Sequence, residues 1–298
     1  MKRLKSNLSN PLIIAIDDLD KETAKKYIDE LIKAGVFNNG VWGVKLIGSE
    51  LNNKEFIMEL QNTKGVLDKP IVRVFSDPLS LCMPDKVESL LSSYTPAHFI
   101  SFPAMGGLPL LREAAKFQKI CPTSRVVPLT VPTYFDEPTC NSVLGKSVEG
   151  AVIYFALIIA HLGFNYLICP PRELKILNKY PEFEKIHKIV PAIRPRWFRK
   201  KGIHQETMTP KEAVEARADY LVVGDPIIYP IVHFQGFAKK RDLKKNPDEA
   251  LKEAWKMAVL KSIEAIEKIL DEISDYLVDT EQKFIVELNK KSSPLEVV

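Results

Sequence analysis

Eight short apolar runs, separated by longer segments with helical periodicity, are the feature that most restricts how this chain can fold. The runs are mostly continuous in hydrophobicity rather than alternating, which is typical of parallel strands buried on both faces. They are Leu12–Ile16, Val41–Ile47, Ile71–Phe75, Phe99–Phe102, Val126–Val131, Tyr166–Cys169, Ile189–Val190 and Tyr220–Val223. Eight strand–helix units in about 250 residues are typical of a (β/α)8 barrel. We therefore predict an α/β chain folded as a (β/α)8 TIM barrel.

Helices are expected between these strands. Lys21–Ala34 carries apolar residues at helical spacing, and Leu108–Phe117 and Ser147–Leu162 behave similarly. Thr209 followed by Pro210 is typical of a helix start, which predicts a helix over Pro210–Ala216. A doubly wound sheet is the alternative fold, but the sequence has neither a glycine-rich dinucleotide motif nor a P-loop to favour it.

The C-terminal part predicts one long amphipathic helix over Asn246–Val278, capped by Asn246 and opened by Pro247. No low-complexity tract or linker divides the chain, so we expect one domain over residues 1–298. Within it we expect a barrel core over about residues 11–230, a basic insertion over 231–245, the terminal helix over 246–278 and a polar tail over 279–298.

Composition narrows the class of ligand and the compartment. The net charge of +4 suits a small anionic ligand and lacks the dense basic stripe of a nucleic-acid binder. The four cysteines form no C-x-x-C pair and lie near no histidine cluster, so we expect no metal site. Their number fits a reducing compartment, and we expect a cytoplasmic protein. We also expect no cofactor. The longest apolar stretch, Ala151–Leu162, is too short to span a bilayer, and the N-terminus is not a secretory signal, so we expect a soluble protein with no membrane partner.

Charged and polar side chains follow the predicted strands at their C-terminal ends, where (β/α)8 barrels bind their ligands. The residues at these ends are Asp17, Lys45, Asp77, Gln205 and Asp225. Placing a charge in a protein interior is costly unless it is paired. The sequence therefore predicts a ligand site at this end of the barrel.

Several segments, in this order, resemble the orotidine 5′-monophosphate decarboxylase family from about residue 11 to residue 230. The resemblance rests on Pro11–Asp17, Gly43–Leu46, Cys169–Leu174, Val190–Pro195, Gln205, Met208–Ala213 and Ala218–Ile227. The family reads P-G-I-R-P after strand seven, continues through a glutamine loop into M-T-P, and ends strand eight with V-G-R-P-I. Each piece is weak alone, but the set in order is fairly specific.

The resemblance implies a lyase that exchanges a carboxylate for a proton on a pyrimidine nucleotide, as in pyrimidine biosynthesis. In the family a lysine supplies the proton and flanking aspartates hold it, in the motif Asp-x-Lys-x-x-Asp at the end of strand three. The implied catalytic residues here are Lys45 and Asp77. Substrate binding is implied for Asp17 and Gln205, and for Thr133, which lies beside Tyr134 near a serine or threonine of the family that contacts the base. The backbone amides near Gly224 are a further candidate for holding an anion.

Strand three departs from the family motif. If Asp77 is the last aspartate of the motif, Val72 stands in place of the first aspartate and Val74 in place of the lysine. If the strand is instead aligned without a gap from Pro70, Val74 and Ser76 stand at these two positions. Neither register supplies a proton donor, because valine and serine carry no acidic ammonium. Arg73 shares a strand face with Asp77 and is a candidate catalytic cation, although arginine is a poor general acid. An outer or lower position on the strand is the alternative for Arg73.

The phosphate end also departs from the family. Asp225 stands where the family has an arginine, and a carboxylate repels a phosphate. Arg194, on the preceding loop, is the predicted compensating cation, and the alternative is that this basic loop is merely solvated.

Three hypotheses remain: an atypical orotidylate decarboxylase, a different lyase on the same barrel, and an inactive homologue that binds a ligand. The resemblance further implies a homodimer in which Asp77 reaches into the partner's site. The C-terminal helix either covers the barrel or adds a contact.

Overall fold

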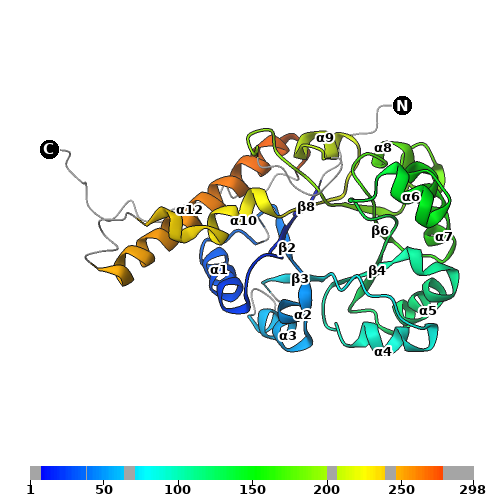
Figure 1. The fold of residues 1–298 in the computed structure, drawn as a ribbon, viewed down its shortest axis with the longest axis horizontal. Coiled ribbons are helices and arrows are strands. Elements are labelled where there is room, and N and C mark those ends of the chain that lie inside the picture. The colour runs from blue at the N-terminus through cyan, green and yellow to red at the C-terminus, as the bar shows by residue number, and fades with distance from the viewer. Residues whose placement is uncertain (1–7, 38, 64–70, 200–206, 239–245, 278–298) are drawn as a thin grey trace.

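The computed structural model describes residues 8–37, 39–63, 71–199, 207–238 and 246–277. Eight parallel strands pair in chain order, and the last pairs with the first, so the sheet closes into a barrel. They are β1 Leu12–Ala15, β2 Val41–Leu46, β3 Arg73–Ser76, β4 Phe99–Pro103, β5 Arg125–Leu129, β6 Tyr166–Ile168, β7 His187–Val190 and β8 Tyr220–Val223. The predicted (β/α)8 fold is confirmed, and Figure 1 shows the ring of strands with helices around it.

All eight predicted strands are present, and each boundary lies within two residues of its predicted position. The largest shifts, of two residues each, are at the start of β3 (Arg73 rather than Ile71), at the end of β5 (Leu129 rather than Val131) and at the start of β7 (His187 rather than Ile189). Pairing explains the first shift, since the ladder between β2 and β3 begins with Gly43 opposite Arg73. Hydrophobicity alone locates a strand, whereas its neighbour decides where the strand begins.

The helices follow the strands in the expected alternation. The α-helices are α1 Lys21–Lys33, α2 Gly48–Leu51, α3 Lys54–Asn62, α4 Val87–Ser92, α5 Gly107–Ile120, α6 Glu137–Leu144, α7 Val148–His161, α8 Leu174–Leu177, α9 Pro210–Glu215, α10 Asp225–Val232 and α12 Pro247–Glu272. Short 3-10 turns are η2 Pro84–Lys86, η3 Ala104–Gly106, η4 Pro181–Phe183, η5 Phe234–Phe237 and η6 Ser274–Tyr276. The predicted start of α9 is confirmed, and Thr209 and Glu212 form a reciprocal capping box there.

Helix α7 is the most apolar helix of the barrel's outer layer. Ser147 caps it by accepting from the Gly150 amide at 3.1 Å, and its buried face includes Val152 and Phe155. Among the described residues, no single helix is both long and apolar enough to cross a membrane. Only α6 and α7 taken together, with a 52° bend between them, meet that criterion of length and composition.

The C-terminal helix α12 is shorter than predicted. It ends at Glu272 and is followed by η6, whereas the sequence predicted continuation to Val278, which lies outside the described residues. The predicted insertion over 231–245 is also helical where it is described, because α10 runs to Val232 and η5 follows. Helix α12 packs against α10 and η5 on the outside of the barrel (Figure 1). A buried hydrogen bond of 2.5 Å between the hydroxyls of Tyr27 and Ser262 joins it to α1.

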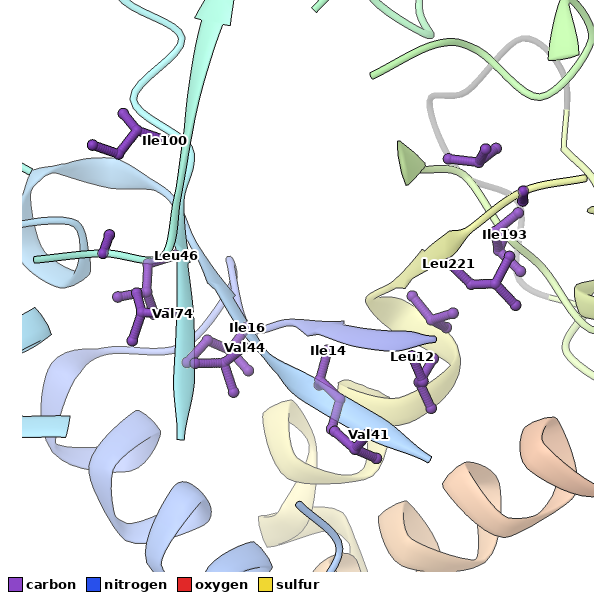
Figure 2. Close-up of a cluster of buried hydrophobic side chains, with 14 of the residues drawn as sticks. Leu12, Ile14, Ile16, Val41, Val44, Leu46, Val74, Ile100, Ile193 and Leu221 are labelled. Atoms are coloured by element: carbon purple, nitrogen blue, oxygen red, sulfur yellow. The ribbon is translucent and has the colours of Figure 1, made fainter. Parts of the chain in front are cut away.

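The main hydrophobic core lies between the barrel and its helices. Alternate strand residues such as Leu12, Ile14 and Val44 supply its inner side (Figure 2). Because successive strand side chains point to opposite faces, the intervening residues point into the barrel.

A smaller cluster fills the barrel interior. Its members include Ile13, Trp42, Phe75 and Phe99, and the rings of Trp42 and Phe99 stack with their centroids 4.4 Å apart. The interior is therefore a packed core and not a pore, as in other barrels of this type.

Candidate active site

Three charged side chains meet at the C-terminal ends of β1, β2 and β3. The Lys45 ammonium donates to the two carboxylate oxygens of Asp17 at 3.0 and 2.8 Å, and to Asp77 Oδ2 at 3.1 Å. Lys45 lies in β2, whereas Asp17 and Asp77 lie in the segments that follow β1 and β3. The structure thus brings together three residues that the sequence singled out separately.

Sheet register directs Lys45 into the barrel. It lies opposite Ala15 on β1 and opposite Phe75 on β3, and both of these belong to the interior cluster. Residues paired directly across a sheet share a face. The lysine side chain therefore rises from the interior toward the open end, where the two aspartates receive it.

Ser101 of β4 extends this cluster, and sequence reasoning missed it. Its fully buried hydroxyl donates to Asp77 Oδ1 at 2.5 Å, so the two oxygens of Asp77 have different partners. This bond fixes the orientation of the carboxylate. Strand parity with the interior residue Phe99 was the signal that could have revealed Ser101.

Electrostatics keep Lys45 protonated. Burial lowers its pKa, but the charges and hydrogen bonds of Asp77 and Asp17 outweigh that effect and raise it to about 12. The pKa of Asp17 is raised, chiefly by burial and only partly offset by Lys45, although 33% of its side chain remains open to the barrel mouth. The cluster therefore presents a protonated ammonium held by two acidic side chains.

Arg73 lies away from this cluster. It is the first residue of β3, about 13 Å below Asp77 at the usual strand rise. Its charge acts instead on His98, just before β4, whose pKa is lowered to about 4 by burial and then by Arg73. The structure therefore places Arg73 at the opposite end of the barrel, and the proposed pairing of Arg73 with Asp77 does not occur.

Strand parity also bears on the family motif at β3. Val72 and Val74 belong to the outer core, and Ser76 donates to Asn52 Oδ1 at 2.6 Å, so these residues face away from the barrel interior. Both registers considered from the sequence put the missing lysine on this outer face. In Asp-x-Lys-x-x-Asp the first aspartate and the lysine share a face. Asp77 points inward and therefore matches the first aspartate, with Leu79 in place of the lysine.

A second ion pair follows β7 and β8. Arg194 Nη2 donates to Asp225 Oδ2 at 3.0 Å, and their side chains are only 13% and 21% exposed. The Arg194 guanidinium also lies 5.7 Å from the centre of the Phe198 ring. The Arg194 amide donates to the Met208 carbonyl at 2.8 Å, so the backbone at this position is held as well. The aspartate that replaces the family arginine thus has a cation of its own.

The other predicted site residues lie at the same end or outside the described residues. Thr133 lies half-buried in the turn after β5, beside exposed Tyr134. Gly224 is the N-cap residue of α10, and its carbonyl accepts from the Ile227 amide at 2.8 Å. Gln205 lies outside the described residues.

Two further expectations concern metals and the partner subunit. Among the described residues, no group of three or more histidine, cysteine, aspartate or glutamate side chains is arranged to hold a metal ion. Asp77, which the resemblance assigned to a partner's site, contacts Lys45 and Ser101 of its own chain.

The chain is similar in sequence to known orotidine 5′-phosphate decarboxylases. The chain is 25% identical over 239 residues to an orotidine 5′-phosphate decarboxylase of Moorella thermoacetica, covering 75% of this chain and 88% of that protein. It is 27% identical over 231 residues to the enzyme of that name from Actinobacillus pleuropneumoniae serotype 5b, covering 74% of this chain and 92% of the relative. No family model matches the chain.

A solved structure shares the fold. The crystal structure of orotidine 5′-phosphate decarboxylase from Lactobacillus acidophilus superposes with a TM-score of 0.59 at 22% identity, covering 83% of this chain and 99% of that one. This likeness supports the barrel architecture.

Proposed function

We propose that this chain, a relative of the orotidine 5′-phosphate decarboxylases, is a carbon–carbon lyase that decarboxylates a pyrimidine carboxylate of the orotidine type. The observation that carries the proposal is the ammonium of Lys45, held between Asp17 and Asp77 at the mouth of the barrel. The negative charge of this ligand lies on the carboxylate that the reaction removes.

Lys45 is the proton donor in this proposal. The bond from the ring carbon to the carboxylate breaks, its electron pair stays on the carbon, and carbon dioxide leaves. An N–H bond of Lys45 then supplies the proton to that carbon, and the neutral amine recovers a proton from water. A general acid of this kind contributes about 10²–10⁴-fold to rate.

The two aspartates and Ser101 prepare Lys45 for this step. Two carboxylates fix the ammonium in place before the substrate arrives, so little reorganisation is needed as negative charge develops on the carbon. Ser101 holds the Asp77 carboxylate in the orientation that leaves Oδ2 on Lys45. Asp17, with its raised pKa and partly open side chain, lies where it can also contact the ligand.

The absence of a lysine from β3 and from residues 77 to 79, where Leu79 holds the position of the family lysine, favours one alternative, an inactive homologue that binds the ligand without turnover. Lys45 would then serve only to hold an anionic group. The two functions differ in whether product forms, so a single assay separates them.

The test is to incubate the purified chain with orotidine or with orotidine 5′-monophosphate and to follow the ultraviolet absorbance of the pyrimidine. We expect conversion of at least one substrate, and a loss of about 10²–10⁴-fold in Lys45→Ala. Lys45→Arg separates charge from proton donation, because arginine keeps the cation but is a poor acid. We expect it to retain ligand binding and to lose turnover.

Lys116→Ala is the matched control, because Lys116 is a surface lysine that is bonded to Glu113 of its own helix and is 71% exposed. Its rate should equal that of the wild type. Ligand binding without product in the wild type would support the alternative, and full activity in Lys45→Ala would reject Lys45 as the donor.

A further inference from the structure

The loops after β7 and β8 form the part of a (β/α)8 barrel that most often holds a phosphate. Phosphates bind there because backbone N–H groups at the start of a short helix point at the anion, and the helix dipole favours negative charge. In this chain the corresponding elements are the segment after Val190 and the start of α10, an eight-residue helix capped by Gly224.

That position already contains a carboxylate of the protein itself. Asp225 is the first residue of α10, so its charge lies where the helix dipole would otherwise favour a ligand anion. It is also bonded to Arg194 at 3.0 Å, with both side chains mostly buried. The Asp225 carboxylate therefore lies beside the two features that would hold a phosphate, which are the start of α10 and the Arg194 guanidinium.

The Arg194 guanidinium is held in this arrangement from its other side as well. Phe198 lies 5.7 Å from it, and the Phe198 ring contacts Tyr229 of α10 edge-on, with centroids 6.1 Å apart. The neighbouring Arg196 does not replace it, because its side chain is 84% exposed and donates to Glu212. Among the described residues of this region, Arg194 and Asp225 thus form a buried pair of opposite charges.

We propose that Asp225 is a specificity residue that makes the site at the barrel mouth select a pyrimidine nucleoside and reject the corresponding 5′-phosphate. A phosphate dianion placed beside Asp225 meets a like charge, and it can take Arg194 only by breaking an existing ion pair. A sugar hydroxyl has no such cost, since it can accept from the arginine or donate to the aspartate. The inference rests on the proposed function for the kind of ligand, a pyrimidine with an attached sugar.

The experiment is equilibrium binding by calorimetry, with uridine and uridine 5′-monophosphate as the probes. Neither reacts, so the result does not depend on turnover, and failure of the proposed chemistry is seen separately in the Lys45 assay. We expect the wild type to bind uridine at least tenfold more tightly than the monophosphate. Equal or tighter binding of the monophosphate, or no binding of either probe, overturns the proposal.

Two variants assign the preference to Asp225. Asp225→Asn removes the like charge, and we expect it to bind the monophosphate at least tenfold more tightly than the wild type while uridine affinity changes less than threefold. Asp85→Asn is the matched control, because it makes the same change in net charge at a side chain that is 67% exposed. We expect it to leave both affinities unchanged. Unchanged binding of the monophosphate by Asp225→Asn would remove Asp225 from the explanation even if the wild-type preference is found.

Discussion

Replacing Lys45 with methionine should destabilise the folded chain strongly, because two carboxylates would be left facing each other without a cation. The shift of the Lys45 pKa from 10.5 to about 12 corresponds to about 2 kcal/mol of stabilisation at neutral pH. Removing one partner of a buried ion pair also leaves an uncompensated charge, so the total loss is typically about 3–5 kcal/mol. We expect a loss of this size for Lys45→Met at pH 7.

The measurement is urea unfolding followed by tryptophan fluorescence, which Trp42 in the barrel interior reports. A cycle with Asp77→Asn tests the electrostatic reasoning, because the asparagine keeps the shape of the side chain and can still accept from Ser101. The double variant should recover at least about 1 kcal/mol relative to Lys45→Met alone. A loss below about 1 kcal/mol in Lys45→Met, or no recovery in the double variant, would refute the account of this cluster.

The same cluster predicts a dependence of stability on pH. The folded-state pKa of Lys45 is raised, so its contribution is fully present below pH 10.5 and is lost as the pH rises through about 12. Wild-type stability should therefore fall across that window more steeply than that of Lys45→Met. In the variant the deficit should shrink as the pH falls, because the raised pKa of Asp17 lets that carboxyl take up a proton and relieve the repulsion. A parallel alkaline decline in both proteins would contradict this assignment.

Two further predictions concern the framework around the site. Ala192 has a left-handed backbone with φ of 60°, which costs a residue with a Cβ about 1–2 kcal/mol. Glycine avoids this cost but loses more entropy on folding, by about 0.5–1 kcal/mol, so Ala192→Gly should stabilise the chain by about 0.5–1 kcal/mol in urea unfolding. A loss of stability in this variant would count against strain at this turn. Tyr27→Phe should cost about 1–3 kcal/mol by leaving the buried Ser262 hydroxyl without its partner, and the additional change Ser262→Ala should recover part of it in thermal unfolding.

Much of the barrel was predictable because its signals are local. A buried parallel strand is a short continuous apolar run, and a helix start such as Thr209-Pro210 carries its cap and its first residue together. The ends of the strands then locate the ligand-binding end of the barrel. Lys45 and Asp17 were identified in this way, from their positions at the ends of the first two runs.

The pairings within the site depended on tertiary structure. The contact of Ser101 with Asp77 spans 24 residues and that of Arg194 with Asp225 spans 31, and no periodicity in the sequence relates such distant positions. Arg73 shares a strand face with Asp77, but a strand rises about 13 Å over four residues, and the pairing of β3 with its neighbours shows which end of the barrel Arg73 occupies.

The physical reason is that a strand's sequence specifies alternation between two faces but not which face points inward or how high each residue lies in the barrel. A shift of one residue in pairing turns every side chain to the other face. The sequence by itself therefore determined the order of strands and helices and the charged residues at the strand ends. The closed sheet decided which of those charged side chains meet. It places Lys45 between Asp17 and Asp77, and it pairs Asp225 with Arg194.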